Sequence, residues 1–143
     1  MSAFALDTRL AADTIPVGNL DLSALRLMTD QRFPWTVLVP RRAAVQELFE
    51  LTRADRALLM DEIAGVSEAL ARLTGAHKMN VAALGNQVAQ LHVHIVARTE
   101  GDAAWPNAIW GKGAPEPYPP GKAEAFAAAL AKALNLAPNA NSL

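Results

Sequence analysis

The chain has 143 residues, enough for one domain with its own hydrophobic core, and its formal net charge is -1. It lacks the basic excess that binds duplex nucleic acid or an anionic membrane surface. Because the sequence has no cysteine, disulfides, thiolate chemistry and cysteine-based metal sites are excluded. The N-terminus does not have the basic start and long apolar core of a signal peptide, and no stretch approaches the roughly 18 apolar residues of a membrane span. We therefore expect a soluble, cytoplasmic protein.

The first half of the chain predicts two strands joined by a turn. Apolar residues alternate around Leu25, and an apolar, β-branched run over residues 35–39 ends at Pro40. A short helix is expected over Ala44–Glu50. The basic pair Arg41–Arg42 is interpreted as surface charge rather than as a phosphate ligand.

A long amphipathic helix follows this segment. Thr52 has the character of an N-cap, with Asp55 three residues on in the manner of a capping box. Apolar residues then recur at spacings of four and three, which is the pattern of one buried helix face, and the helix is expected to stop near Gly75. The residues of this predicted core face are Leu59, Ile63, Val66, Leu70 and Leu73.

The second half predicts a hairpin, an irregular loop and a final helix. Strands are expected over Lys78–Leu84 and Gln90–Ala97, and the short linker between them favours an antiparallel pair. Residues 99–121 are rich in proline and glycine and predict a loop, and residues 122–136 predict an alanine-rich helix. Since strands and helices do not alternate regularly, we expect a single α+β domain over residues 1–143 with a mainly antiparallel sheet.

Two of the three histidines of the chain lie one residue apart in the second strand of this hairpin. Because strand residues i and i+2 point to the same face, Gln90, His92 and His94 are expected to form one polar row. The polar row must face water, a cleft or a ligand, because burying each polar group unpaired costs about 1–3 kcal/mol. The residues expected to face the core instead are Leu91, Val93 and Ile95.

Three interpretations of this row remain open on the residues alone. The histidines can be solvent-facing side chains without a role. They can chelate a metal ion, but a third ligand is needed, and His77 lies before the preceding strand without an obvious route to the same face. They can also act in nucleophilic catalysis, since a neutral imidazole whose Nδ1–H is held by a backbone carbonyl has a free Nε2 that attacks phosphorus. Gly85, Asn86 and Gln87 would supply donors for an oxyanion beside the row.

The stretch GNQVAQLHVHIVAR resembles the signature of the histidine triad (HIT) proteins. In that signature a glycine, a polar pair and a valine precede three histidines that alternate with apolar residues, and Gln90 stands where the first histidine would be. The matching positions are Gly85, Val88, His92, His94, Ile95 and Val96. The strand WTVLVPRR, the long helix after it and Trp105–Pro106 also resemble the family, so that the resemblance covers roughly residues 20–110.

The resemblance implies an α+β fold with a five-stranded, mainly antiparallel sheet, a long amphipathic helix and a C-terminal helix. It also implies a homodimer and a small-molecule nucleotide substrate that is hydrolysed or transferred at its α-phosphate. The substrate classes are nucleoside phosphoramidates, dinucleoside polyphosphates and nucleotidyl adducts. No cofactor and no metal ion is expected, and neither a nucleic acid polymer nor a membrane is expected as a partner.

Residue by residue, the resemblance makes His92 the nucleophile that forms a nucleotidyl-histidine intermediate. It makes His94 the side chain that contacts the phosphate or the leaving group, and Gln90 completes the catalytic set. The implied substrate contacts are Asp30, for the ribose hydroxyls, and, around the phosphate and leaving group, Asn80, Gly85, Asn86, Gln87 and Val88.

Gln90 leaves two functions open. Glutamine forms hydrogen bonds but does not titrate near neutral pH, so it can replace a histidine that orients its neighbours but not one that carries a proton. The chain is therefore expected to be an enzyme acting through His92, with a nucleotide-binding module of little or no catalytic activity as the alternative. The backbone carbonyl of residue 90, which can fix the tautomer of His92, does not depend on the side chain.

Overall fold

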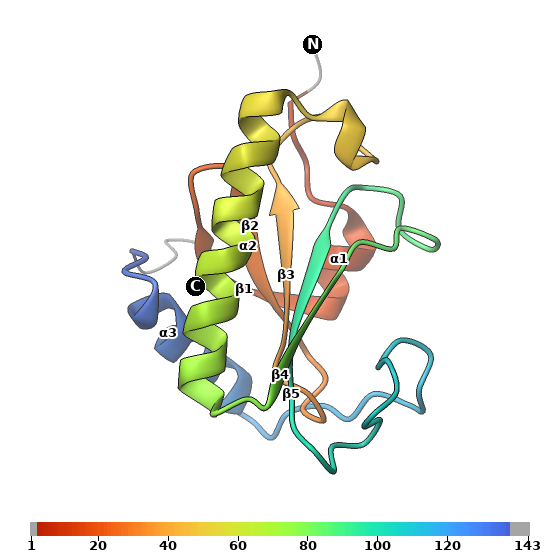
Figure 1. The fold of residues 1–143 in the computed structure, drawn as a ribbon, viewed down its shortest axis with the longest axis vertical. Helices are drawn as coiled ribbons and strands as arrows, with labels where there is room; N and C mark the ends of the chain where they lie inside the picture. Colours follow the sequence, from red (N-terminus) through yellow and green to blue (C-terminus); the bar gives the residue numbers. More distant parts are fainter. Residues whose placement is uncertain (1–2, 138–143) are drawn as a thin grey trace.

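The computed structural model describes residues 3–137, and Figure 1 shows the arrangement of their elements. In chain order these are α1 (Thr8–Asp13), β1 (Thr14–Asn19), β2 (Ser23–Met28), β3 (Trp35–Pro40), the 3₁₀ turn η1 (Leu48–Glu50), α2 (Arg53–Thr74), β4 (Lys78–Ala82), β5 (Val93–Arg98) and α3 (Lys122–Ala133). The five strands form one sheet in the order β1-β2-β3-β5-β4, with all neighbouring strands antiparallel. The predicted α+β fold is confirmed, whereas the single domain predicted over residues 1–143 extends at both ends beyond the described residues.

The two faces of the sheet are covered by different parts of the chain. In Figure 1, α2 crosses in front of the sheet with α3 beside it, and both helices contribute to the main hydrophobic core. Because side chains alternate along a strand, Val93 and Ile95 of β5 belong to this core, whereas Val96 belongs to a smaller cluster with Phe33 and the loop after β5. His94 shares the face of Val96 and therefore points away from α2.

The helix α2 begins and ends with the signals expected from the sequence. The hydroxyl of Thr52 accepts a hydrogen bond from the backbone N–H of Asp55 at 3.1 Å, and Gly75 adopts the left-handed conformation that ends the helix. The side chain of Leu73, predicted to be core, is 41% exposed. The residues of the predicted face that are buried are Leu59, Val66 and Leu70. Among the helices of residues 3–137, none is long and apolar enough to cross a membrane.

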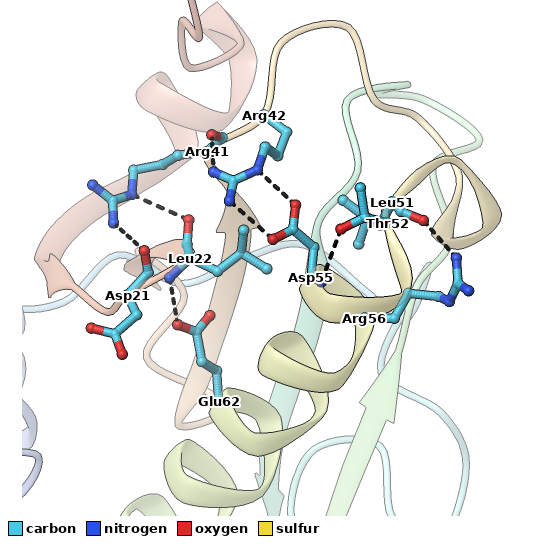
Figure 2. A network of polar contacts seen from close by, with 9 residues as sticks. All are labelled: Asp21, Leu22, Arg41, Arg42, Leu51, Thr52, Asp55, Arg56 and Glu62. Carbon is cyan, nitrogen blue, oxygen red and sulfur yellow. Dashed lines mark hydrogen bonds and ion pairs between the residues drawn. The ribbon is translucent and has the colours of Figure 1, made fainter.

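Polar contacts join α2, the segment before β2 and the residues after β3 (Figure 2). Arg42 pairs with Asp55, with 2.7 Å between Nε and Oδ2, and the guanidinium of Arg41 donates to the carbonyl of Leu22. The buried carboxylate of Glu62 accepts a hydrogen bond from the backbone N–H of Leu22 at 2.8 Å. Arg42 therefore joins the end of β3 to α2, whereas Arg41 binds the segment that connects β1 and β2.

The segment between β3 and α2 differs from its prediction. The helix predicted over Ala44–Glu50 is wrong, because Ala44 has a positive φ of 58° and Glu47 is extended, so that only the turn η1 forms. The chain before Leu20, for which the sequence analysis predicted no element, forms α1 and the edge strand β1.

The hairpin also differs in its bounds. Its second strand begins at Val93 rather than at Gln90, because the backbone N–H of Leu91 donates to the carbonyl of Val45 at 3.0 Å instead of continuing the ladder with β4. The antiparallel pairing of β4 with β5 is as predicted. The polar row is therefore not a single strand face, and the side chain of Gln90 is free to point elsewhere.

Candidate active site

A cleft of about 370 Å³ lies at the sheet face opposite α2, with His92 and His94 on its wall. The rest of its lining comes from α1, the end of β2, Trp35, the loop over residues 84–88 and residues 110–111. His92 is 7% exposed and His94 6%, and the centroids of the two rings are 4.8 Å apart. The fold thus holds two imidazoles side by side, largely shielded from water, at one cleft.

His92 lies one residue before β5, and the backbone fixes its tautomer. Its Nδ1 is 2.7 Å from the carbonyl oxygen of Gln90. A carbonyl only accepts hydrogen bonds, so Nδ1 carries the proton of the neutral ring and Nε2 keeps its lone pair. The ring is therefore oriented as a nucleophile requires, whatever the side chain at position 90.

The Nδ1 of His94 accepts a hydrogen bond, whereas that of His92 donates one. The indole N–H of Trp35 donates to its Nδ1 at 2.9 Å, and Trp110 packs against the ring with 5.4 Å between centroids. Burial, with a smaller contribution from the neighbouring His92, lowers the pKa of His94 to about 4. His94 is therefore neutral at physiological pH, with its proton on Nε2.

The loop before β5 forms another wall of the cleft. Gly85, Asn86, Gln87 and Val88 all line it, as the sequence analysis expected of a loop beside the histidines. Gly85 has a φ of 79°, a conformation that favours glycine, and this turn brings the exposed amides of Asn86 and Gln87 to the cleft. The loop supplies polar donors next to the two imidazoles.

The side chain of Gln90 lies outside this cleft, on the N-terminal segment. Its Oε1 accepts a hydrogen bond from the backbone N–H of Asp7, and its Nε2 donates to the carbonyl of Ala5, each at 2.8 Å. Only its backbone carbonyl reaches the histidine pair, through His92. The side chain of Gln90, predicted to belong to the catalytic set, is thus absent from the cleft lining and shares only a smaller cavity of about 100 Å³ with His92.

Asp30 lines an adjoining cavity of about 390 Å³. The two cavities have Arg9 and Trp35 among their shared lining residues. Asp30 is 3% exposed and is paired with Arg32, with 2.8 Å between Oδ2 and Nη2. Burial alone would raise the pKa of Asp30, but hydrogen bonds from Arg32 and the backbone of Glu116 outweigh it and hold the pKa below its usual value. Asp30 therefore stands beside the histidine cleft rather than in it.

Asn80 does not line the cleft. Its Oδ1 accepts a hydrogen bond from Nη1 of Arg98 at 2.8 Å, on the sheet face that also carries Val96 and His94. Arg98 is 1% exposed, so the amide of Asn80 satisfies a buried guanidinium. This contact gives Asn80 a structural partner in place of the expected phosphate.

Sequence reasoning missed the contribution of α1, which brings Arg9, Leu10 and Asp13 to the cleft. The signal was present in Asp7, whose Oδ1 caps the helix by accepting from the backbone N–H of Arg9 at 2.8 Å. Arg9 forms an exposed ion pair with Asp13 at 3.7 Å and is the cationic side chain of the cleft lining. Within residues 3–137, no group of three or more His, Cys, Asp or Glu side chains is placed to hold a metal ion.

Comparisons with known proteins agree with this geometry. A family model described as the HIT domain matches residues 9–101. A histidine triad protein of Sinorhizobium meliloti 1021 is 50% identical, with a TM-score of 0.88 over 90% of this chain and 96% of that one. A histidine triad protein of Bradyrhizobium japonicum is 44% identical, with a TM-score of 0.90 over 93% of this chain and 99% of that one. A histidine triad protein of Marinobacter aquaeolei VT8 is 43% identical, with a TM-score of 0.91 over 95% of this chain and 100% of that one. None of the curated proteins compared with the chain matches it.

Proposed function

Because the chain belongs to the histidine triad (HIT) family, whose members are generally nucleotide hydrolases or transferases, we propose that it cleaves nucleotides at an α-phosphate. His92 is the nucleophile, and the nucleotidyl group passes first to its Nε2 and then to water or another acceptor. The observation that carries this proposal is the 2.7 Å contact between Nδ1 of His92 and the carbonyl of Gln90, which leaves a lone pair on Nε2. That nitrogen belongs to a ring on the wall of a cleft lined with polar donors.

In this proposal the α-phosphate binds between the histidines and the loop that contains Gly85, Asn86, Gln87 and Val88. His94 donates from Nε2 to a phosphate or leaving-group oxygen, and the charge of Arg9 favours an anionic ligand. These groups stabilise the charge that develops as His92 attacks.

The nucleoside extends into the adjoining cavity, where Asp30 is the proposed ribose contact. Its carboxylate already accepts from Arg32 and from the backbone of Glu116, so a ribose hydroxyl binds only when Arg32 releases one oxygen. Asn80 is left out of the proposed contacts because its amide is bound to Arg98.

The proposal is tested with adenosine 5′-phosphoramidate and a diadenosine polyphosphate as substrates. We expect turnover of at least one, and a rate loss of about 10³-fold or more in His92→Ala, because no other group in the cleft replaces the nucleophile. His77→Ala is the control, since this histidine is exposed and lies outside the cleft. No turnover of either substrate, or unchanged turnover in His92→Ala, contradicts the proposal.

A nucleotide-binding module with little or no catalysis is the second candidate. The observation that favours it is Gln90, which stands at the position of the first motif histidine and does not titrate. This candidate predicts binding of AMP in calorimetry with negligible hydrolysis of the substrates above. It also predicts that Gln90→His raises turnover.

We further propose that the chain forms a homodimer through β4 and the adjacent surface of α2. β4 is an edge strand, and an edge presents backbone groups that can pair with a second copy. An apolar groove of about 280 Å³ runs beside it, lined by side chains that include Met60 and Val81, which are 62% and 48% exposed. A two-fold axis at this edge would join two sheets and cover two such grooves.

Sedimentation velocity tests this assembly. We expect a dimer for the wild-type protein and a monomer for Val81→Lys, because a charge in the groove opposes its burial. Leu73→Lys is the matched control, since this leucine is also exposed but lies outside the groove. A monomeric wild-type protein, or equal dissociation by both variants, contradicts the proposed interface.

A further inference from the structure

The hydrogen bond from Trp35 to His94 determines which nitrogen of His94 carries the proton of the neutral ring. The indole Nε1–H donates only, and it lies 2.9 Å from Nδ1 of His94. The ring is 6% exposed and is packed between Trp35 and Trp110, with centroids at 5.7 Å and 5.4 Å. Protonating Nδ1 would place two N–H groups against each other in a buried site. His94 is thus confined to the neutral tautomer with Nε2–H.

This tautomer limits what His94 does for a leaving group. A neutral imidazole N–H donates a hydrogen bond, but transferring its proton would leave an imidazolate, which is not available near neutral pH. The low pKa of His94, which results first from burial and then from His92, agrees with this geometry because it keeps the imidazolium unpopulated. His94 is therefore a hydrogen-bond donor without being a general acid.

The other polar side chains of the cleft do not supply the missing proton. Arg9 is permanently charged, and Asp13, ion-paired with Arg9 at 3.7 Å, is an acceptor when ionised. The Nδ1–H of His92 is committed to the carbonyl of Gln90, on the far side of the ring from the attacking nitrogen. Asn86 and Gln87 carry amides that do not titrate. Among the described residues that line the cleft, none is thus placed to protonate a departing group.

We propose that this site acts on nucleotidyl substrates whose leaving group departs as a stable anion, such as a phosphate or polyphosphate, in preference to phosphoramidates, whose departing amine must gain a proton. The inference rests on the proposed function and selects among its substrate classes. The residue that sets the preference is Trp35, which acts through His94 and is therefore a positioning residue.

The proposed chemistry balances without a general acid. The lone pair on Nε2 of His92 forms a bond to phosphorus, and the bond from phosphorus to the leaving oxygen breaks, with its electron pair staying on that oxygen. The nucleotidyl-imidazolium keeps its proton on Nδ1. Water then attacks phosphorus, the electron pair of the N–P bond returns to Nε2, and the water proton passes to solvent. With an amine leaving group, the nitrogen would need a proton from solvent as the P–N bond breaks.

The test compares kcat/KM for diadenosine triphosphate and adenosine 5′-phosphoramidate, which give the same adenylyl-histidine intermediate. We expect kcat/KM of the wild-type protein to be higher for the polyphosphate by about 10²-fold or more. A general acid usually contributes at least this factor, and none is available here to protonate the departing amine. In Trp35→Phe the preference narrows by about tenfold or more as pH falls from 6 to 4, because the released Nδ1 accepts a proton in the range set by the low pKa of His94 and the protonated ring can then donate one. Trp110→Phe is the matched control, since the indole Nε1 of Trp110 has no hydrogen-bond partner, and the ratio of the two rates is expected to stay unchanged.

The outcomes separate the inference from the proposed function. Equal His92-dependent rates with both substrates overturn the inference and leave the proposed function standing, whereas turnover of neither overturns both. An equal narrowing in Trp110→Phe overturns the role of Trp35. A measurement on the wild-type protein alone uses aryl esters of AMP: a steep dependence of kcat/KM on the acidity of the phenol supports departure as an anion, and a flat dependence overturns it.

Discussion

Gln90 joins the histidine segment to the N-terminal segment through both atoms of its amide, which bind Asp7 and Ala5 on either side of Leu6. A carboxamide presents a donor and an acceptor on one edge, which suits two backbone groups of one extended segment. The two nitrogens of an imidazole point in divergent directions and do not make both bonds with the same segment. Glutamine at this position is therefore suited to holding the chain that leads into α1.

Gln90→Met and Gln90→His are each expected to lower the free energy of unfolding by about 1–3 kcal/mol, since they lose one or both of these hydrogen bonds. Urea denaturation measures the change. Gln46→Met, at an exposed glutamine, is the control and is expected to shift the free energy by less than about 0.5 kcal/mol. A Gln90→His protein that is as stable as the wild type and turns over faster would refute this account of Gln90.

At the scale of elements, the loop after β5 brings Trp110 to the cleft, and one ion pair anchors it. Arg98, the last residue of β5, is 1% exposed, and its Nε lies 2.7 Å from Oδ2 of Asp102. The same carboxylate accepts from the backbone N–H groups of Ala104 and Trp105. The hydrogen bond from Arg98, assisted by these backbone bonds, lowers the pKa of Asp102 to about 2.

Asp102→Ala is expected to lower the free energy of unfolding by about 3–5 kcal/mol, because it leaves a buried guanidinium with the amide of Asn80 but without a carboxylate partner. Chemical denaturation measures this loss. Glu100→Ala removes a carboxylate from the same turn, but its pair with His77 is exposed, so the expected change is less than about 1 kcal/mol. Similar losses in the two variants would mean that the buried pair does not anchor the loop.

At the scale of the whole molecule, the stability of the fold depends on pH through His94. Its folded pKa of about 4 lies below the ordinary value of 6.5, so the unfolded chain binds a proton between these values and the folded chain does not. The free energy of unfolding therefore falls as pH falls from about 6.5 to about 4, by up to roughly 3 kcal/mol, and does not depend on His94 above pH 6.5. Below about pH 4, protonation of Asp102 adds a further loss as pH approaches 2.

Urea denaturation across pH 2 to 8 measures this dependence. His94→Gln is expected to remove most of the slope between pH 6.5 and 4, because the buried imidazole is gone, and to keep the loss below pH 4 that belongs to Asp102. If the free energy of unfolding falls equally in His94→Gln and the wild type between pH 6.5 and 4, His94 is not the group that titrates.

Local patterns predicted the parts of the fold whose signals lie within a few residues of one another. The caps and apolar spacing predicted α2, and strand alternation predicted that His92 and His94 share a face. Alternation failed at Gln90, whose amide binds residues 83 and 85 positions away. Trp35 likewise reaches His94 across 59 positions. Such contacts depend on how the sheet and the N-terminal segment meet, and no spacing within one element specifies them.

Trapping the covalent intermediate shows whether His92 carries the nucleotidyl group. The protein is mixed with diadenosine triphosphate and quenched in alkali, because the P–N bond is labile in acid, and its peptides are analysed by mass spectrometry. We expect an adenylyl group on His92 that is absent from His92→Ala and from protein incubated without substrate. Turnover of the substrate with an adenylyl group on His94 alone, or with no adduct and undiminished in His92→Ala, would contradict it.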